Sequence, residues 1–179
     1  MKIALTGISG AGKDYLGKVL LDEMEFERIS FSDELKSIAS RIYPWLEFYY
    51  EPSVKNKPLN ITTNFGIKIE KSPRDIWLAL DFLRTIDPFV FIYGVDNRIE
   101  MYEKERNILI TDIRTQQEFD FCKSKGFTTI FIQPTKEIYK KYSFDYFSRS
   151  SKENCDFIFE NTFQEDSKYK FLEMIKKEL

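Results

Sequence analysis

The chain has 179 residues, enough for one domain with a sizeable core, and its hydrophobic fraction of 42% includes 17 Phe and 10 Tyr. Acidic and basic residues are intermixed and leave a net charge of −2, which argues against a nucleic-acid groove or a basic membrane face. The chain contains no histidine, so Ser-His-Asp and Cys-His catalysis and zinc held by histidine are excluded.

Two cysteines, Cys122 and Cys155, are too few to form a metal cage, and we expect both to be buried thiols in a reducing compartment. The sequence shows no signal peptide, no lipidation motif and no apolar segment long enough to span a bilayer. We therefore expect a soluble cytoplasmic protein (in the host cytoplasm if the source is a virus) that binds neither nucleic acid nor membranes.

The first strand and the loop after it are the most informative part of the chain. Residues 2–6 are an apolar run typical of a buried strand, residues 7–14 read Gly-Ile-Ser-Gly-Ala-Gly-Lys-Asp, and a helix is expected over 13–24. Glycines let backbone N–H groups point at an anion, the helix start adds the positive end of its dipole, and Lys13 can reach the outer phosphates. We call residues 7–14 the phosphate loop; the alternative is a turn that merely joins strand to helix.

Asp14 stands where Ser or Thr normally holds magnesium in this pattern. A carboxylate beside a triphosphate is tolerable only if cations offset its charge, so we expect Asp14 to hold Mg2+ directly or through a water molecule. The sequence therefore predicts a nucleotide-using enzyme with ATP and Mg2+ as cofactors.

A second strand is expected over 26–31 and a helix over 34–42. Asp33 either caps this helix or contacts an acceptor substrate. Lys36, one turn later, either meets the acceptor's phosphate or is a solvated surface lysine. Residues 43–71 contain three prolines and scattered aromatics, and we expect an excursion from the core with a hairpin.

Two further helices are predicted in the middle of the chain. Ser72 caps the first, expected over 73–84, and the second is expected over 88–104. Arg74 and Arg84 are candidate substrate-binding residues, although surface arginines are common.

A continuous apolar strand, expected over 107–111, ends at Asp112. This pattern is typical of a second magnesium-positioning carboxylate, and the alternative is a cap for the next helix, expected over 116–125. Arg114 follows near the carboxyl end of the strand, where open parallel sheets bind ligands, and it suits a bidentate contact with a phosphate.

The rest of the chain predicts strands over 127–132 and 155–159 and a closing helix over 165–179. The basic, aromatic segment 135–153 is either a solvated face or a mobile lid whose Arg149 closes over the transferring phosphoryl group. Because strands alternate with helices, we expect an α/β fold whose parallel sheet is covered by helices on both faces.

Taken in order, these motifs resemble the phage-type deoxynucleoside monophosphate kinases, a branch of the P-loop kinases. The resemblance rests on the phosphate loop and on residues 31–36, 72–74, 110–118 and 155–161. It implies one three-layer P-loop kinase core over 1–179 with a parallel five-stranded sheet in the order 2-3-1-4-5. It also implies a helical substrate-binding insertion over 43–104 and a lid over 135–153.

The activity implied by the resemblance is ATP-dependent phosphorylation of a (deoxy)nucleoside monophosphate. Donor binding is assigned by the resemblance to Gly10, Gly12, Lys13 and Asp14, with Asn161 and Thr162 near the donor base. Acceptor binding is assigned to Asp33, Lys36, Arg74 and Arg114. We add the adjoining Gly7, Ala11 and Tyr15 to the donor site, Arg84 and Asp112 to the acceptor site, and Asp14 and Asp112 as the metal ligands.

At neutral pH the acceptor phosphate is largely ionised, so in-line transfer of the γ-phosphoryl group needs no general base. Lys13, Arg114 and Arg149 would act by placement and charge neutralisation. Two other functions fit the same motifs: a kinase for another phosphorylated metabolite, of the dephospho-coenzyme A or phosphomevalonate type, and a nucleotide-binding module without transfer. The aromatic residues of 43–50 and 89–93 fit base stacking, a homodimer face or a buried core.

Overall fold

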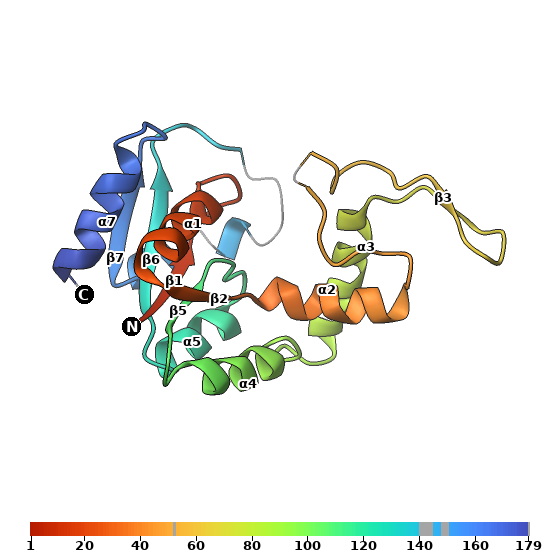
Figure 1. Ribbon diagram of the computed structural model, residues 1–179, viewed down its shortest axis with the longest axis horizontal. Helices are drawn as coiled ribbons and strands as arrows, with labels where there is room; N and C mark the ends of the chain where they lie inside the picture. The colour runs from red at the N-terminus through yellow and green to blue at the C-terminus, as the bar shows by residue number, and fades with distance from the viewer. Residues whose placement is uncertain (52, 140–144, 148–150, 179) are drawn as a thin grey trace. The chain divides into compact units, whose positions relative to one another are not determined.

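The computed structural model describes residues 1–51, 53–139, 145–147 and 151–178 (Figure 1). The chain divides into two compact units, the first formed by Met1–Ser30 with Val95–Leu179 and the second by Phe31–Gly94. The insertion expected over 43–104 overlaps the second unit with different bounds, and its substrate-binding role stays a prediction. In the part of the chain that is described, no helix combines the length and the apolar character that a membrane crossing requires.

The first unit is built on a five-stranded parallel sheet in the spatial order β2-β5-β1-β6-β7 (Figure 1). Its strands are β1 Lys2–Thr6, β2 Phe26–Ile29, β5 Asn107–Ile110, β6 Thr128–Pro134 and β7 Phe157–Asn161. Counted in chain order within this sheet, the order is 2-3-1-4-5, so the prediction is confirmed. The carboxyl ends of β2, β5 and β1 are therefore neighbours at one edge of the sheet.

One face of this sheet carries an apolar cluster that joins it to two helices, α1 Lys13–Met24 and α7 Ser167–Glu178. Leu16 and Leu20 of α1 and Phe171 of α7 are fully buried against strand residues that include Leu5 and Leu109. The helical residues recur three or four positions apart, as one helix face requires. Each buried side chain of this size contributes about 1.5–3 kcal/mol, so this cluster anchors the phosphate loop between β1 and α1.

The opposite face is covered by α4 Ile92–Tyr102 and α5 Gln116–Ser124. Val95 and Ile99 of α4 and Phe119 and Cys122 of α5 are buried but do not belong to the first cluster. The predicted α/β arrangement, a parallel sheet with helices on both faces, is therefore confirmed. Burial raises the pKa of the Cys122 thiol well above its ordinary value, as expected for an inert thiol.

The second unit is small and mostly helical. It contains α2 Phe31–Ile42, an antiparallel hairpin of β3 Ile61–Thr62 and β4 Lys68–Ile69, α3 Pro73–Leu80 and the short 3-10 helix η1 Asp81–Thr85. The hairpin expected within 43–71 is confirmed. Ser72 caps α3 as predicted, because its hydroxyl accepts the Asp75 N–H at 3.1 Å and the Asp75 carboxylate accepts the Ser72 N–H at 3.1 Å.

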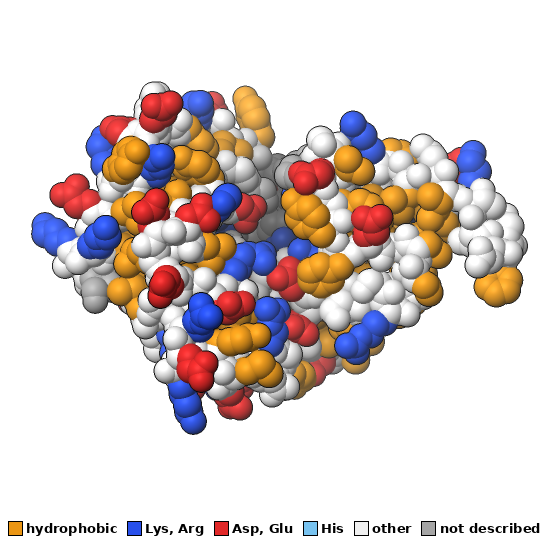
Figure 2. Space-filling model, viewed as in Figure 1, with side chains coloured by type: hydrophobic (Ala, Val, Ile, Leu, Met, Phe, Trp, Pro, Cys, Tyr) orange, Lys and Arg blue, Asp and Glu red, His pale blue; other side chains and the backbone are white. Residues whose placement is uncertain are grey.

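The surface of the second unit exposes many hydrophobic side chains, which Figure 2 shows on its visible face. Phe65 at the hairpin is 93% exposed, and Phe48 and Tyr49 are also exposed, whereas Phe91 is fully buried. The buried-core interpretation of the aromatic runs is therefore wrong for Phe48, Tyr49, Phe89 and Tyr93, which are all exposed, and correct for Phe91.

Several element bounds differ from the predictions: the helix expected over 73–84 is α3 followed by η1, and the helix expected over 88–104 is the shorter α4. Two other differences have visible reasons. Helix α2 begins at Phe31, so Asp33 lies in its first turn, where a carboxylate still favours the positive end of the helix dipole. The cap interpretation of Asp33 is therefore wrong. Strand β7 begins at Phe157, because Cys155 belongs to a turn: its N–H and thiol donate to the carbonyls of Lys152 and Ser151, both at 3.3 Å.

Candidate active site

The phosphate loop has the backbone that its glycines predict. Gly7, Gly10 and Gly12 adopt positive φ angles of 136°, 86° and 94°, a region that side chains disfavour. A Cβ at Gly7 would lie 2.6 Å from the carbonyl oxygen of Ile132, and one at Gly12 would overlap the side-chain amide nitrogen of Asn161. Glycine is therefore required by both conformation and space at these two positions.

Helix α1 begins directly behind Gly12, without a capping side chain. The first hydrogen bond of the helix runs from the Leu16 N–H to the Gly12 carbonyl at 3.0 Å, so the N–H groups of Lys13, Asp14 and Tyr15 precede the bonded turns. N–H donors of this kind and the positive end of a helix dipole are the features that favour an anion at a helix start. The side chains of Asp14 and Tyr15 are exposed at this helix start.

The Lys13 ammonium lies on its own loop. It donates to the carbonyl oxygens of Gly7 at 2.7 Å and Ile8 at 2.9 Å. Burial lowers the pKa of Lys13 to about 8; Asp14 opposes this shift and Arg114 adds to it. The ammonium is thus partly buried in the loop and bonded to two of its carbonyl oxygens.

Asp112 lies at the carboxyl end of β5, as predicted, and is buried. Its Oδ2 accepts the hydroxyl of Ser30, which follows the neighbouring strand β2, at 2.7 Å. Because β5 is the parallel neighbour of β1, Asp112 lies at the same edge of the sheet as the start of the phosphate loop. Its charge raises the pKa of Lys13. The cap interpretation of Asp112 is wrong, because Thr115 caps α5.

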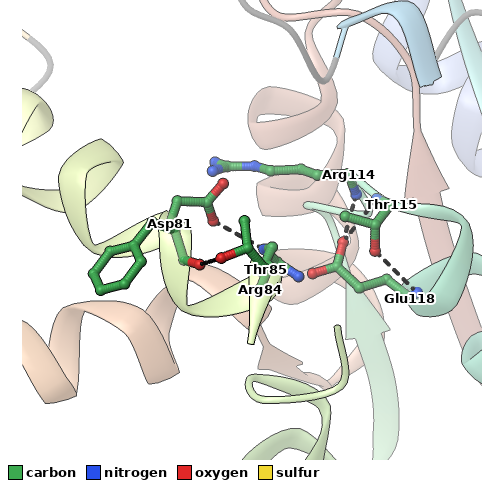
Figure 3. Close-up of polar contacts among 7 residues, drawn as sticks. Asp81, Arg84, Thr85, Arg114, Thr115 and Glu118 are labelled. Atoms are coloured by element: carbon green, nitrogen blue, oxygen red, sulfur yellow. Dashed lines mark hydrogen bonds and ion pairs between the residues drawn. The ribbon is translucent and has the colours of Figure 1, made fainter. Parts of the chain in front are cut away.

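Arg114 is positioned through its backbone by a buried carboxylate (Figure 3). Glu118 Oε2 accepts the N–H groups of Arg114 at 2.6 Å and Thr115 at 3.1 Å, and the Thr115 hydroxyl accepts the Glu118 N–H at 3.2 Å. Glu118 is fully buried, and the Arg114 side chain extends away from this cap (Figure 3). These reciprocal hydrogen bonds fix the backbone of Arg114 and therefore the point from which its side chain extends.

Asn161, at the end of β7, ties the phosphate loop to the carboxyl-terminal part of the chain. Its amide donates to the Ala11 carbonyl at 2.9 Å, and its Oδ1 accepts the Phe163 N–H at 3.1 Å and the Ser167 hydroxyl at 2.9 Å. Asn161 is buried and Thr162 partly exposed. The structure brings Asn161 to the loop, and the contact of Asn161 and Thr162 with a donor base stays a prediction.

Asp145 is a residue of this site that the sequence analysis missed. Its Oδ1 accepts the N–H of Ser9 in the phosphate loop at 2.8 Å, and the residue is 1% exposed. Its charge also raises the pKa of Lys13. It lies within the segment 135–153 expected to form a lid, and Arg149, chosen there as the lid residue, falls outside the described residues.

In the second unit, Asp33 and Lys36 form an ion pair of 2.9 Å on α2. Their side chains are only 11% and 19% exposed, so Lys36 is not a solvated surface lysine. The Lys36 ammonium also lies 5.5 Å from the ring centre of Phe48 and 5.8 Å from that of Trp77. An ammonium is thus held beside a carboxylate and two aromatic faces.

The two arginines of the second unit are held differently. The Arg84 Nε donates to Asp81 at 2.9 Å (Figure 3), and its guanidinium lies 4.6 Å from the ring centre of Phe91. The backbone N–H of Arg74, in the first turn of α3, donates to the Lys55 carbonyl at 3.0 Å. Acceptor binding by either arginine stays a prediction.

The carboxylates near the phosphate loop are ligands of the type that Mg2+ takes. Asp14 and Asp112 offer carboxylate oxygens near the loop, and Mg2+ is usually held by one or two carboxylates together with substrate phosphates. Among the residues that the structure describes, no group of three or more Cys, Asp and Glu side chains could hold a metal ion. A site completed by phosphate oxygens is thus the kind that these residues suit.

Comparison with solved structures identifies the fold. The dephospho-CoA kinase of Campylobacter jejuni is 16% identical with a TM-score of 0.61, over 99% of this chain and 97% of that chain. The shikimate kinase of Aquifex aeolicus vf5 is 14% identical with a TM-score of 0.52, over 99% and 95%. No family model and no curated protein sequence matches the chain. The chain therefore shares the α/β fold of these two kinases.

Proposed function

We propose that this protein transfers the γ-phosphoryl group of ATP to the phosphate of a (deoxy)nucleoside monophosphate. The observation that carries the proposal is the phosphate loop, whose Lys13 ammonium lies at an uncapped helix start close to Asp112 and Arg114. The kinase fold of the similar structures supports a phosphotransferase acting on a small molecule.

The donor's phosphates are assigned to the phosphate loop. N–H groups of the loop, from Gly7, Gly10, Ala11 and Gly12 to Tyr15, would bind the phosphate oxygens, and Lys13 would move from the loop carbonyls to the outer phosphates. Asp14 and Asp112 would hold Mg2+, which supplies neutralisation of the charge on the transferring group. Ser30 keeps the Asp112 carboxylate in place.

The acceptor's phosphate is assigned to Arg114, whose guanidinium can bind two phosphate oxygens at once. At neutral pH that phosphate is largely ionised and attacks without a general base, so the protein's task is placement and charge neutralisation. Asp33, Lys36, Arg74 and Arg84 of the second unit are proposed for the rest of the acceptor, and Arg149 for the lid. The rings of Phe48 and Trp77 beside Lys36 support an acceptor with a planar base.

A second candidate is phosphorylation of a dephospho-coenzyme A type of acceptor. The Campylobacter jejuni enzyme shares the fold over nearly the whole of both chains, and the chemistry of the phosphate loop would be the same. The two candidates differ only in the acceptor. A module that binds ATP without transfer is the third, and an acceptor panel separates all three.

The test is ADP release, coupled to an optical assay, with ATP and each acceptor in turn. The panel holds the four deoxynucleoside monophosphates, their ribose forms, dephospho-coenzyme A and phosphomevalonate, with Lys13→Ala as the inactive control. Turnover with one or more nucleoside monophosphates supports the proposal. Turnover with dephospho-coenzyme A alone would replace it by the second candidate, and ATP binding without any turnover would favour the module.

A further inference from the structure

A carboxylate already occupies part of the phosphate loop. The Asp145 Oδ1 accepts the Ser9 N–H at 2.8 Å, and the residue is almost completely buried. Ser9 lies between Gly7 and Gly10, whose positive φ angles shape the loop. An anionic oxygen from the chain itself therefore lies where the loop presents backbone N–H groups to anions.

The ammonium of Lys13 also has hydrogen-bond partners from the protein itself. The Lys13 ammonium donates to the carbonyls of Gly7 and Ile8, and the Asp145 charge is close enough to raise its pKa. Among the described residues, the other charged groups that act on Lys13 are Asp14, Asp112 and Arg114. Before any ligand binds, the loop thus has internal partners for one of its N–H groups and for its ammonium.

A phosphate cannot share this position with Asp145. Both groups are anionic, both accept backbone N–H groups, and two anions in a half-buried site repel each other strongly. A hydrogen bond to a charged group contributes more than a neutral one, so displacing the carboxylate has an appreciable cost.

We propose that Asp145 is an internal competitor for the phosphate loop, which a ligand's phosphate must displace from the Ser9 N–H before the loop binds it. The inference rests on the proposed function only in that the loop binds phosphates, and it is independent of the acceptor. Competition by the Asp145 carboxylate would make the affinity of the protein for the phosphate donor weaker than that of the same loop without this carboxylate.

The test compares the affinity for inorganic pyrophosphate and for Mg·ADP, measured by calorimetry, in the wild type, Asp145→Asn and Asp145→Ala. Asn keeps an oxygen for the Ser9 N–H but removes the charge, and Ala removes both. The matched control is Asp166→Asn, which removes one negative charge from an exposed ion pair with Lys170 on α7. All titrations are made at about pH 6.5, below the pKa of about 8 of Lys13, so that its ammonium stays charged.

We expect both Asp145 variants to bind pyrophosphate and Mg·ADP about tenfold more tightly than the wild type and the control. Unchanged or weaker binding in a folded variant would overturn the inference and leave the proposed function untouched. If no form of the folded protein binds either ligand, the proposed function itself fails.

A measurement on the wild type covers the case in which neither variant folds. In amide NMR spectra, saturating pyrophosphate should move the Ser9 resonance together with those of Gly10 and Gly12, because its hydrogen-bond acceptor changes. If Gly10 and Gly12 move while Ser9 stays in place, Asp145 is a fixed anchor of the loop and the inference is wrong.

Discussion

The ammonium of Lys13 donates a 2.7 Å hydrogen bond to the carbonyl oxygen of Gly7, six residues earlier in the same loop. A backbone carbonyl is a weaker partner than a phosphate, because a charge-assisted bond between two ions is about twice as strong. The lysine is thus held on the loop proposed to bind the donor's phosphates, by contacts that it can exchange for a phosphate.

Replacement of Lys13 by Ala should lower turnover by a factor on the order of 100 or more, because the transferring group loses a fixed positive charge. The far-ultraviolet circular dichroism spectrum should stay unchanged, since the helix start needs no lysine side chain. The matched control is Lys18→Ala on the same helix, which removes only an exposed ion pair with Asp22 and should leave turnover unchanged. Near-normal turnover in Lys13→Ala would remove the lysine from the mechanism.

The pKa of Lys13, about 8 in the folded protein, predicts a pH profile. The value of kcat/KM for ATP should fall as the pH rises through about 8, because the free protein loses the ammonium there. In Lys13→Arg the residual activity should show no fall near that pH, since a guanidinium keeps its charge. A profile that stays flat from about pH 7 to 9 would contradict the assignment.

The same shift predicts a change in stability. The unfolded chain keeps the Lys13 proton up to its ordinary pKa of 10.5, whereas the folded chain releases it near 8. Between these values the unfolded state binds more protons, so the free energy of unfolding rises with pH. Below about pH 8 both states hold the proton, and the full cost of burying the charged ammonium lowers the stability of the folded chain. The comparison of wild type with Lys13→Met in urea unfolding at several pH values isolates this contribution; a parallel dependence in both would contradict it.

Gly12→Ala should abolish donor binding. The new Cβ combines a positive φ angle with overlap of the Asn161 amide, so the amide that holds the Ala11 carbonyl has to move. The control is Gly126→Ala, also at positive φ but in open space, which should lose about 1 kcal/mol of stability and no binding. Equal nucleotide affinity in both variants, measured by calorimetry, would show that the Gly12 backbone does not shape the site.

Ser30→Ala should raise the concentration of Mg2+ needed for half-maximal turnover. The change removes the hydroxyl that donates to the Asp112 carboxylate at 2.7 Å. Leaving a buried carboxylate without this partner lowers the stability of the folded protein by about 1–3 kcal/mol. In the control, Ser124→Ala, the lost hydroxyl donates to the Phe121 carbonyl at the surface. A variant with reduced stability but an unchanged Mg2+ requirement would give Ser30 and Asp112 a structural role only.

Lys36→Met should raise the KM for the acceptor and leave the KM for ATP unchanged. Met keeps the apolar contact with the rings of Phe48 and Trp77 but removes the charge that pairs with Asp33. Lys68→Met, in the exposed hairpin pair with Glu70 of the same unit, should change neither constant. A rise in the KM for ATP instead would move Lys36 from the acceptor to the donor.

The glycine-rich loop, the position of Asp112 and the parallel sheet with helices on both faces could be predicted because their signals are local or follow from a repeated strand–helix alternation. The strand order could be predicted only from the resemblance. Gly7, Gly12 and Lys13 lie within one short segment, and each residue type has a clear physical reason. The course of the sheet follows from apolar runs that match buried parallel strands.

Asp145 could not be predicted, because its contact with Ser9 joins residues 136 positions apart and comes from a segment without periodicity. The same holds for Asn161, whose amide reaches the Ala11 carbonyl across 150 positions. A resemblance suggested that Asn161 lies near the donor, but only the folded chain shows that its side chain holds the loop. Long-range side-chain contacts of this kind leave no pattern in a single sequence.

The most direct test of the account is a crystal structure of the protein with Mg·ADP. We predict β-phosphate oxygens at about 2.7–3.2 Å from the N–H nitrogens of Gly10, Gly12 and Lys13, with the Lys13 ammonium on the phosphates instead of the Gly7 carbonyl. Nucleotide bound elsewhere, or a loop whose lysine keeps its contact with Gly7 beside a bound nucleotide, would contradict the account.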